Sequence, residues 1–232
     1  TKMNNNNSSK QILLSVLGVA ILVVAVVGIS FAAFTYARPG AKTNTISTGT
    51  ITMNYSEDTN GIKLENALPM TDTAGKTLAA DNQKFDFTVS ATMSGTATIN
   101  YAVTAVKTAD STLPDSGVKV YLTKRSDNTE SMTEDPVSEP KYVGDVSGKS
   151  LSKVDATVKA NTGAILDEYL LDQGTFTTNN ESTAKTQSVY YRLRMWVADD
   201  YAETNGGVAG QITSKKYTLK VNVYGAAAAQ QP

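Results

Sequence analysis

The residues of this chain that could do chemistry are carboxylates, hydroxyls and basic side chains, because its 232 residues include no histidine and no cysteine. Without histidine, the commonest general base and the commonest zinc ligand are missing. Without cysteine there are no disulfides, thiolate metal sites or cysteine nucleophiles. Most hydrolase and metalloenzyme mechanisms are therefore excluded, and the sequence predicts a protein that is not an enzyme and has no cofactor.

Adjacent carboxylates occur at three places, Glu57-Asp58, Asp167-Glu168 and Asp199-Asp200. A glycosidase needs two carboxylates that face each other across a cleft, whereas neighbouring residues of a strand point to opposite faces. The last pair is different in context, because it follows the most hydrophobic predicted strand and precedes a glycine-rich loop. Asp199 and Asp200 are therefore a candidate Ca²⁺ site, against the simpler alternative of a solvated turn, which we favour.

Large polar and aromatic side chains alternate along one predicted strand, residues 189–197. Arg192, Arg194 and Trp196 share one face, with Tyr190 above them. These four residues are a candidate surface patch for an anionic glycan or polymer, or a cation–π ladder. The alternative is that the arginines pair with Asp or Glu of a neighbouring strand, and the pattern favours this second interpretation.

A long apolar segment lies near the N-terminus, with no charged residue between Lys10 and Arg38. Residues 12–34 are long enough to cross a bilayer core, which needs about 20 apolar residues, so we expect a lipid bilayer as partner. The segment is either a signal cut between Ala32 and Ala33 or an uncleaved anchor, and its length helps the anchor interpretation. Both interpretations predict that the rest of the chain is exported to the non-cytoplasmic side.

Four regions follow from composition. We expect a disordered polar flank at residues 1–11, a transmembrane helix or signal at 12–37, an extended linker at 38–48 and a β-domain at 49–232.

A net charge of −1 gives no electrostatic footprint for nucleic acid, so we expect no nucleic-acid partner.

Period-two alternation of apolar and polar residues recurs after the linker and is typical of antiparallel strands with one buried face. Ser94-Gly95 is a predicted tight hairpin turn between two of these strands. No long amphipathic helical pattern interrupts the strands, so the sequence predicts an all-β fold, a single antiparallel β-sandwich of seven to nine strands. We expect the strand at 187–197 to be central. The predicted strands include residues 51–55, 85–93, 97–105, 118–122, 189–197 and 217–223.

Several short motifs match one family. They are GISFAAF at 28–34, TGTITM at 48–53, LENALPMTD at 64–72, FDFTV at 85–89, SGTATINY at 94–101, YRLRMW at 191–196 and YTLKVNV at 217–223. In these motifs the chain resembles the TasA and camelysin-type proteins of Gram-positive bacteria, which are exported through a dedicated signal peptidase. The likeness is best over the N-terminal hundred residues, and residues 107–186 have no counterpart.

The resemblance implies a jelly-roll-like sandwich that polymerises into surface or matrix fibres by donor-strand exchange. In that process the mature N-terminal segment fills a neighbour's sheet. The candidate donor strand lies within residues 41–50 and includes Ile46, Thr48 and Thr50, of which Ile46 is the only large apolar side chain. A flexible stalk between membrane and sandwich is the alternative for the same segment.

Two functions remain open at this point. The first is a non-catalytic, exported fibre or matrix subunit that self-associates. The second is a membrane-anchored cell-surface or virion protein with an uncleaved N-terminal helix, which would contact other surface or virion proteins. A camelysin-like protease is a third and less favoured possibility, because the chain has no histidine to bind zinc.

Overall fold

The computed structural model describes residues 35–39, 44–48, 51–57, 61–80, 83–127, 129, 133–201 and 215–228. The apolar segment 12–34, the candidate cleavage site at Ala32 and Ala33, and Thr50 lie outside these residues. No helix within the described ranges has the length and apolar character that crossing a bilayer requires.

The described chain consists mainly of β-strands, which pair antiparallel except where β5 meets β10. This confirms the predicted all-β class. Within the described ranges, the helices α2 (Asp72–Lys76) and α3 (Ala156–Thr162) and the 3₁₀ turn η1 (Asp115–Gly117) interrupt the strands. The strands are β1 (Thr35–Pro39), β2 (Asn44–Thr48), β3 (Ile51–Glu57), β4 (Ile62–Glu65), β5 (Pro69–Met70), β6 (Lys84–Lys107), β7 (Val118–Arg125), β8 (Glu134–Pro136), β9 (Lys141–Tyr142), β10 (Tyr169–Ala198) and β11 (Lys216–Ala227).

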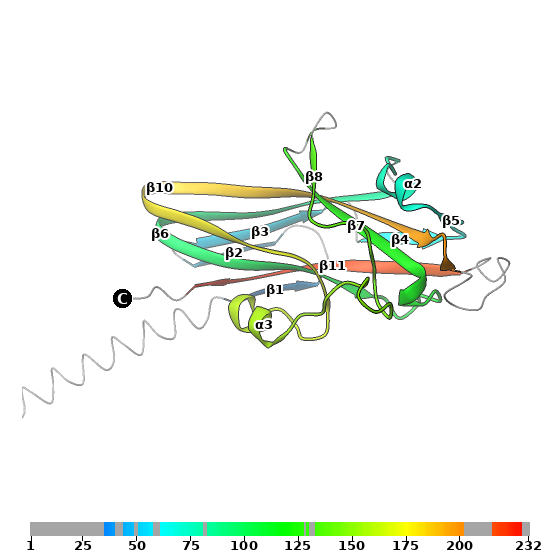
Figure 1. Ribbon diagram of the computed structural model, residues 1–232. Coiled ribbons are helices and arrows are strands. Elements are labelled where there is room, and N and C mark those ends of the chain that lie inside the picture. Colours follow the sequence, from blue (N-terminus) through cyan, green and yellow to red (C-terminus); the bar gives the residue numbers. More distant parts are fainter. Residues whose placement is uncertain are drawn as a thin grey trace, which may run out of the picture.

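Two long strands, β6 and β10, pair with each other along most of their length and bend together. In β6 the bend coincides with Gly95, whose φ of 72° favours glycine. In β10 it coincides with register shifts between Thr178 and Lys185. Figure 1 shows each strand running along one layer and returning along the other, with both bends at the same end of the molecule. We call this end the corner.

The corner corrects one prediction. Ser94-Gly95 is not a hairpin turn, because the two halves of β6 pair with β10 and do not pair with each other. The sequence signal for a turn was correct, since the chain does change direction at Gly95. The local sequence could not show which strand pairs with the two halves of β6. That strand is β10, which bends at the same level and continues the hydrogen bonding around the corner.

The paired strands form two layers joined at the corner (Figure 1). One layer contains β2, β3, the first half of β6, the second half of β10, β7 and β8. The other contains β11, the second half of β6 and the first half of β10, with β1 and β4 along the outer edge of β11. The predicted central position of 187–197 is confirmed, because this part of β10 lies between β6 and β7.

The N-terminal boundary of the sheet differs from the sequence prediction. Thr35–Pro39, expected at the end of a helix and the start of a linker, forms β1 and pairs with β11. Asn44–Thr48, expected in the linker, forms β2 and pairs with β3. Among the described residues, strands therefore already occur at Thr35–Pro39 and Asn44–Thr48, before residue 49, because β11 and β3 offer open edges to these segments.

The core lies between the two layers and is filled by the alternate residues that the sequence predicted to face inward. Phe87 stacks on Tyr191 with ring centroids 5.0 Å apart, and Tyr101 stacks on Phe176 at 4.8 Å. The hydroxyls of Tyr101 and Tyr191 are 3.0 Å apart and join the two layers. Leu193 is fully buried beside them.

The two helices cover the outer faces of different layers. A hydrogen bond from the backbone N–H of Val158 to Asp155 caps the N-terminus of α3, whose Val158 packs with Tyr224 and Ala102 on the layer of β11. Helix α2 lies on the other layer, over the second half of β10 (Figure 1). Its backbone N–H at Ala74 donates to the side chain of Thr71.

Candidate functional site

The predicted surface patch is mostly buried. Arg192 and Arg194 are only 4% and 5% exposed, and Trp196 is completely buried. Tyr190 is half-buried at the end of the row. The sequence placed these side chains on the correct outer face of β10, but β8 and the segment 69–80 cover that face.

The arginines pair with acidic residues, as the favoured alternative predicted. Arg192 lies directly opposite Asp86 of β6 and donates from Nε to Oδ1 and from Nη2 to Oδ2, both at 2.7 Å. Arg125 of β7 approaches the same carboxylate at 2.8 Å. Such two-pronged pairs are short and directional. This cluster therefore connects three adjacent strands on the outer face.

Glu134 supplies the second carboxylate of the cluster. Arg194 donates to its two oxygens at 2.5 and 2.8 Å, Arg192 donates at 3.1 Å, and the hydroxyl of Thr123 donates at 2.7 Å. The hydrogen bonds from Arg194 lower the pKa of Glu134 to about 2, even though burial opposes the shift. Because Glu134 begins β8, this carboxylate fastens β8 to the sheet.

Trp196 is the only tryptophan of the chain and lies under α2. A methyl group added at Gly75 would come within 2.3 Å of the indole ring, so α2 rests on the ring without a side chain between them. The segment that follows is fixed by Arg194, whose Nε donates to the carbonyl of Leu78 at 2.6 Å. Trp196 Nε1 is buried and has no hydrogen-bond partner among the described residues.

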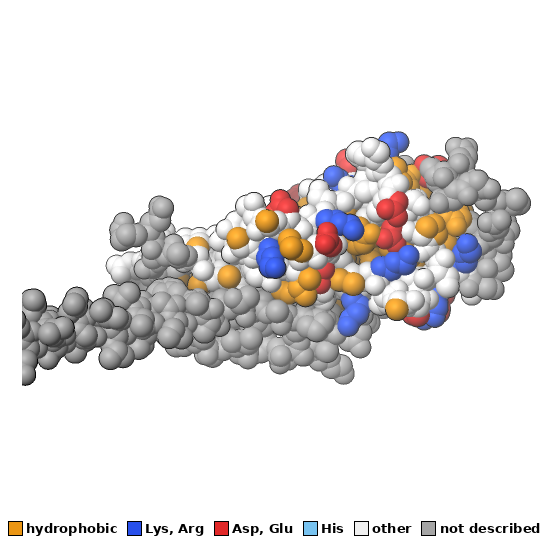
Figure 2. All heavy atoms as spheres, turned by 90° about the horizontal axis from the view of Figure 1, so that it is seen from below, with side chains coloured by type: hydrophobic (Ala, Val, Ile, Leu, Met, Phe, Trp, Pro, Cys, Tyr) orange, Lys and Arg blue, Asp and Glu red, His pale blue; other side chains and the backbone are white. Residues whose placement is uncertain are grey.

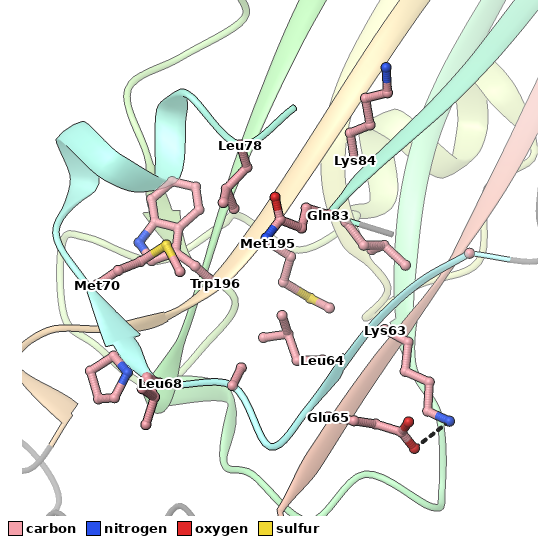
Figure 3. Close-up of a pocket in the computed structure, with 14 residues that line it drawn as sticks. Lys63, Leu64, Glu65, Leu68, Met70, Leu78, Gln83, Lys84, Met195 and Trp196 are labelled. Carbon is pink, nitrogen blue, oxygen red and sulfur yellow. Dashed lines mark ion pairs between the residues drawn. The ribbon is translucent and has the colours of Figure 1, made fainter. Parts of the chain in front are cut away.

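An apolar groove of about 740 Å³ opens beside Trp196, and its volume falls in the range typical of ligand sites, about 300–1,000 Å³. Figure 3 shows side chains from the two layers converging on it, with Leu64 and Leu68 across from Trp196 and Met195. Leu68 is 77% exposed at its lip. The groove lies at the end opposite the corner, where β6 begins. Its apolar lining includes Ile62, Leu64, Leu68, Met70, Leu78, Met195 and Trp196.

Polar side chains line the rim of this groove. Lys63 and Glu65 pair at 2.5 Å, with both side chains about half exposed, and the dashed line in Figure 3 marks this pair. Gln83 and Lys84 stand at the start of β6 on the other side. An apolar floor with a charged rim suits an amphipathic partner.

The remaining buried carboxylates are held by tyrosine hydroxyls. Tyr191 donates to Asp172 at 2.7 Å, and Lys124 pairs with the same carboxylate at 2.9 Å. Burial and the nearby carboxylate raise the pKa of Tyr191, so its hydroxyl remains a donor. The other pairs join Tyr169 and Tyr217 to Asp115, Tyr224 to Glu168 and Tyr142 to Asp200. These contacts connect the strands to the loops.

The candidate Ca²⁺ site gains no further ligands in the described part of the chain. Asp199 is exposed, and Asp200 accepts the hydroxyl of Tyr142. No group of three or more acidic residues that could hold a metal ion occurs among the described residues. Among the described residues, the two carboxylates therefore differ in environment, since Asp199 faces solvent and Asp200 holds the hydroxyl of Tyr142.

The candidate donor strand is partly described. Ile46 and Thr48 lie in β2, opposite Met53 and Ile51 of β3 in the same chain. This pairing replaces the expected free linker.

Sequence reasoning missed the groove, because its lining comes from separate segments. The available signal was Leu68, a large apolar residue between Ala67 and Pro69 in a stretch with no strand-like alternation.

Comparison with known proteins assigns this chain to no family. No protein-family model and no curated protein matches the chain. One matching solved structure is described as TmCBM61 in complex with beta-1,4-galactotriose. The identity is 10%, over 74% of this chain and 86% of the other, with a TM-score of 0.19. A likeness this low does not establish a shared fold.

Proposed function

We propose that this chain is a non-catalytic structural subunit of an exported surface or matrix fibre, with a jelly-roll-like sandwich and an N-terminal strand that passes between copies. One observation carries this proposal. The first described strand, β1, is a five-residue edge strand that pairs with β11, and it directly follows the apolar segment 12–34. A cut between Ala32 and Ala33 would free that strand's N-terminal end.

Edge pairing of this kind supports exchange for a simple physical reason. The antiparallel register runs from Thr35 opposite Ala226 to Pro39 opposite Asn222, and it consists of backbone contacts. A strand from another copy can make the same backbone hydrogen bonds on the same edge. Exchange that passes in one direction from copy to copy joins them head to tail, and it generates a fibre when the rotation between copies does not close a ring.

The non-catalytic part of the proposal is supported by how the polar groups are used. Asp86 and Glu134 are held by arginines, and Asp115, Glu168 and Asp172 by tyrosine hydroxyls. A protease or glycosidase needs such groups to face a substrate. The purified full chain should therefore leave casein uncleaved. Cleavage that a single substitution abolishes would contradict this part.

Engineered cysteines test strand exchange cleanly, because the natural chain has none. Thr35→Cys and Ala226→Cys place two thiols on directly opposed residues, whose Cα atoms in antiparallel pairs are about 4.5–5.5 Å apart, within disulfide range. If strands exchange, oxidation of assembled protein produces a covalent ladder on a non-reducing denaturing gel. The single variant Thr35→Cys is the control and should give no ladder.

The second candidate is a membrane-anchored surface or virion protein. It is favoured by the uncharged length of residues 12–34 and by the pairing of β1 within its own chain. In this case the double-cysteine protein forms an internal disulfide and runs as a monomer. A mass measurement of the N-terminus in the native source separates the two functions independently, since only the fibre subunit starts at Ala33.

A further inference from the structure

We propose that the apolar groove beside Trp196 receives Ile165 and Leu166 from a second copy of this chain. The inference rests on the proposed function, because it supplies a contact through which copies would associate in addition to strand exchange. It is carried by the position and chemistry of two separate features: the groove and a rigid, exposed apolar loop.

Exposed large hydrophobic residues are confined to these two features among the described residues. Leu68, at the lip of the groove, is 77% exposed, while Ile165 and Leu166 are 55% and 42% exposed. Solvation of neighbouring large apolar side chains is unfavourable, and such side chains mark contact sites when they are held in place. The face that carries α3 shows small groups of hydrophobic side chains between charged ones (Figure 2).

The loop with Ile165 and Leu166 is fixed on both sides. Gly163, with φ of 76°, ends α3 and donates its backbone N–H to Lys159 at 2.8 Å. On the other side, the backbone N–H of Asp167 donates to the carbonyl of Val154 at 3.3 Å. Ala164 is fully buried beneath the loop. The two apolar side chains are therefore presented as a preformed projection, which lowers the entropy lost on binding.

Size and charge fit this projection to the groove. A volume of about 740 Å³ is ample for two aliphatic side chains, and the apolar lining matches them. The exposed carboxylate of Asp167 follows Leu166, and the rim of the groove carries Lys63 in its half-exposed ion pair with Glu65. An approaching Asp167 would share Lys63 with Glu65 at the rim, while apolar burial at the centre of the contact would stabilise it.

The arrangement of the two features predicts an open assembly. The projection follows α3 on the layer of β11, whereas the groove lies at the end of the molecule near α2 (Figure 1). A contact between two different surfaces joins copies head to tail. The contact is small compared with the roughly 1,200 Å² of a stable interface, so it acts where many copies are concentrated.

Mixed cysteine crosslinking of the full chain tests the contact. Leu68→Cys and Leu166→Cys are made separately, and the two proteins are mixed in equal amounts and oxidised. We expect a dimer band mainly in the mixture, with the 68–166 disulfide identified by mass spectrometry. A 68–68 disulfide in Leu68→Cys alone would instead indicate groove-to-groove pairing and overturn the inference.

Charge substitutions provide the second measurement. Leu166→Asp should weaken sedimentation-detected self-association about tenfold or more, as expected for a buried anchor. The control Ala160→Asp adds the same charge at an exposed site on α3 and should change it less than about twofold. Assembly that forms without the 68–166 disulfide and tolerates Leu166→Asp overturns the inference alone. A wild-type chain that begins at Ala33 and never assembles overturns the proposed function as well.

Discussion

Arg192 and Asp86 lie directly opposite each other on β10 and β6, and the guanidinium donates two hydrogen bonds of 2.7 Å to the carboxylate. Their side chains are only 5% and 12% exposed. Arg125 shares the carboxylate, so Asp86 compensates two buried cations at once. Loss of such a partner leaves charge in a poorly solvated place, which costs much more than the net value of the pair.

Asp86→Asn should therefore lower the free energy of unfolding by about 3–5 kcal/mol, because the buried Arg125 and Arg192 lose the negative charge of Asp86, and Glu134 remains as a carboxylate partner of Arg192. Urea denaturation at neutral pH measures the change. Glu65→Gln removes the acid of the exposed Lys63 pair and should cost less than about 1 kcal/mol. Equal effects of the two substitutions on the free energy of unfolding would show that the stabilisation by the arginine cluster does not depend on its burial.

Stability should fall with acid through Glu134. The pKa of Glu134 is about 2 in the folded chain, below its ordinary value of 4.5, so the folded state binds fewer protons between these values. The contribution of Glu134 to the free energy of unfolding is complete above about pH 4.5 and is lost as the pH falls towards 2. Allowing for solvent screening, it amounts to about 1–2 kcal/mol.

Glu134→Gln checks this origin. The variant should be less stable than the wild type at pH 7 and should lose less stability between pH 4.5 and pH 2.5, as measured by denaturation at each pH. If both proteins lose stability in parallel over that range, the acid sensitivity comes from other carboxylates, such as Asp115, whose pKa is lowered by hydrogen bonds from Tyr169 and Lys107 against the effect of burial.

Leu193→Ala should destabilise the sandwich by about 2–5 kcal/mol, because Leu193 is fully buried on the central strand and its removal leaves a cavity between the layers. Thermal unfolding followed by circular dichroism measures the effect. Leu68→Ala is the matched control, since Leu68 is mostly exposed in the monomer. A melting temperature of Leu193→Ala within a degree or two of the wild type would show that the inward register of β10 is wrong.

Gly75→Ala should displace α2 from the indole of Trp196, because the added methyl group would come within 2.3 Å of the ring. Fluorescence reports this directly, since Trp196 is the only tryptophan. We expect a red-shifted emission and stronger quenching by iodide, as the ring becomes solvated. Thr73→Ala changes an exposed residue of the same helix and should leave the spectrum unchanged. An unshifted spectrum for Gly75→Ala would mean that α2 does not cover the ring.

The sequence by itself determined where most strands lie and which side chains face inward. Alternation with a period of two shows which face of a strand each side chain occupies, and this assignment does not depend on distant parts of the chain. Phe85, Phe87, Tyr191 and Leu193 are therefore buried as expected. The first half of β10 escaped prediction because it is mostly polar, and only residues such as Leu171 and Phe176 mark its inner face.

Only the tertiary structure decided what covers the outer faces. Arg192 and Arg194 occupy the predicted face, but β8 and the segment 69–80 bury them there, and nothing in the local sequence of β10 reveals those covers. The corner depends on two strands bending at the same level, and the groove on Leu64, Leu68 and Trp196 meeting from distant positions. Such contacts come from topology, because the period of a strand assigns a side chain to a face and says nothing about what packs on it.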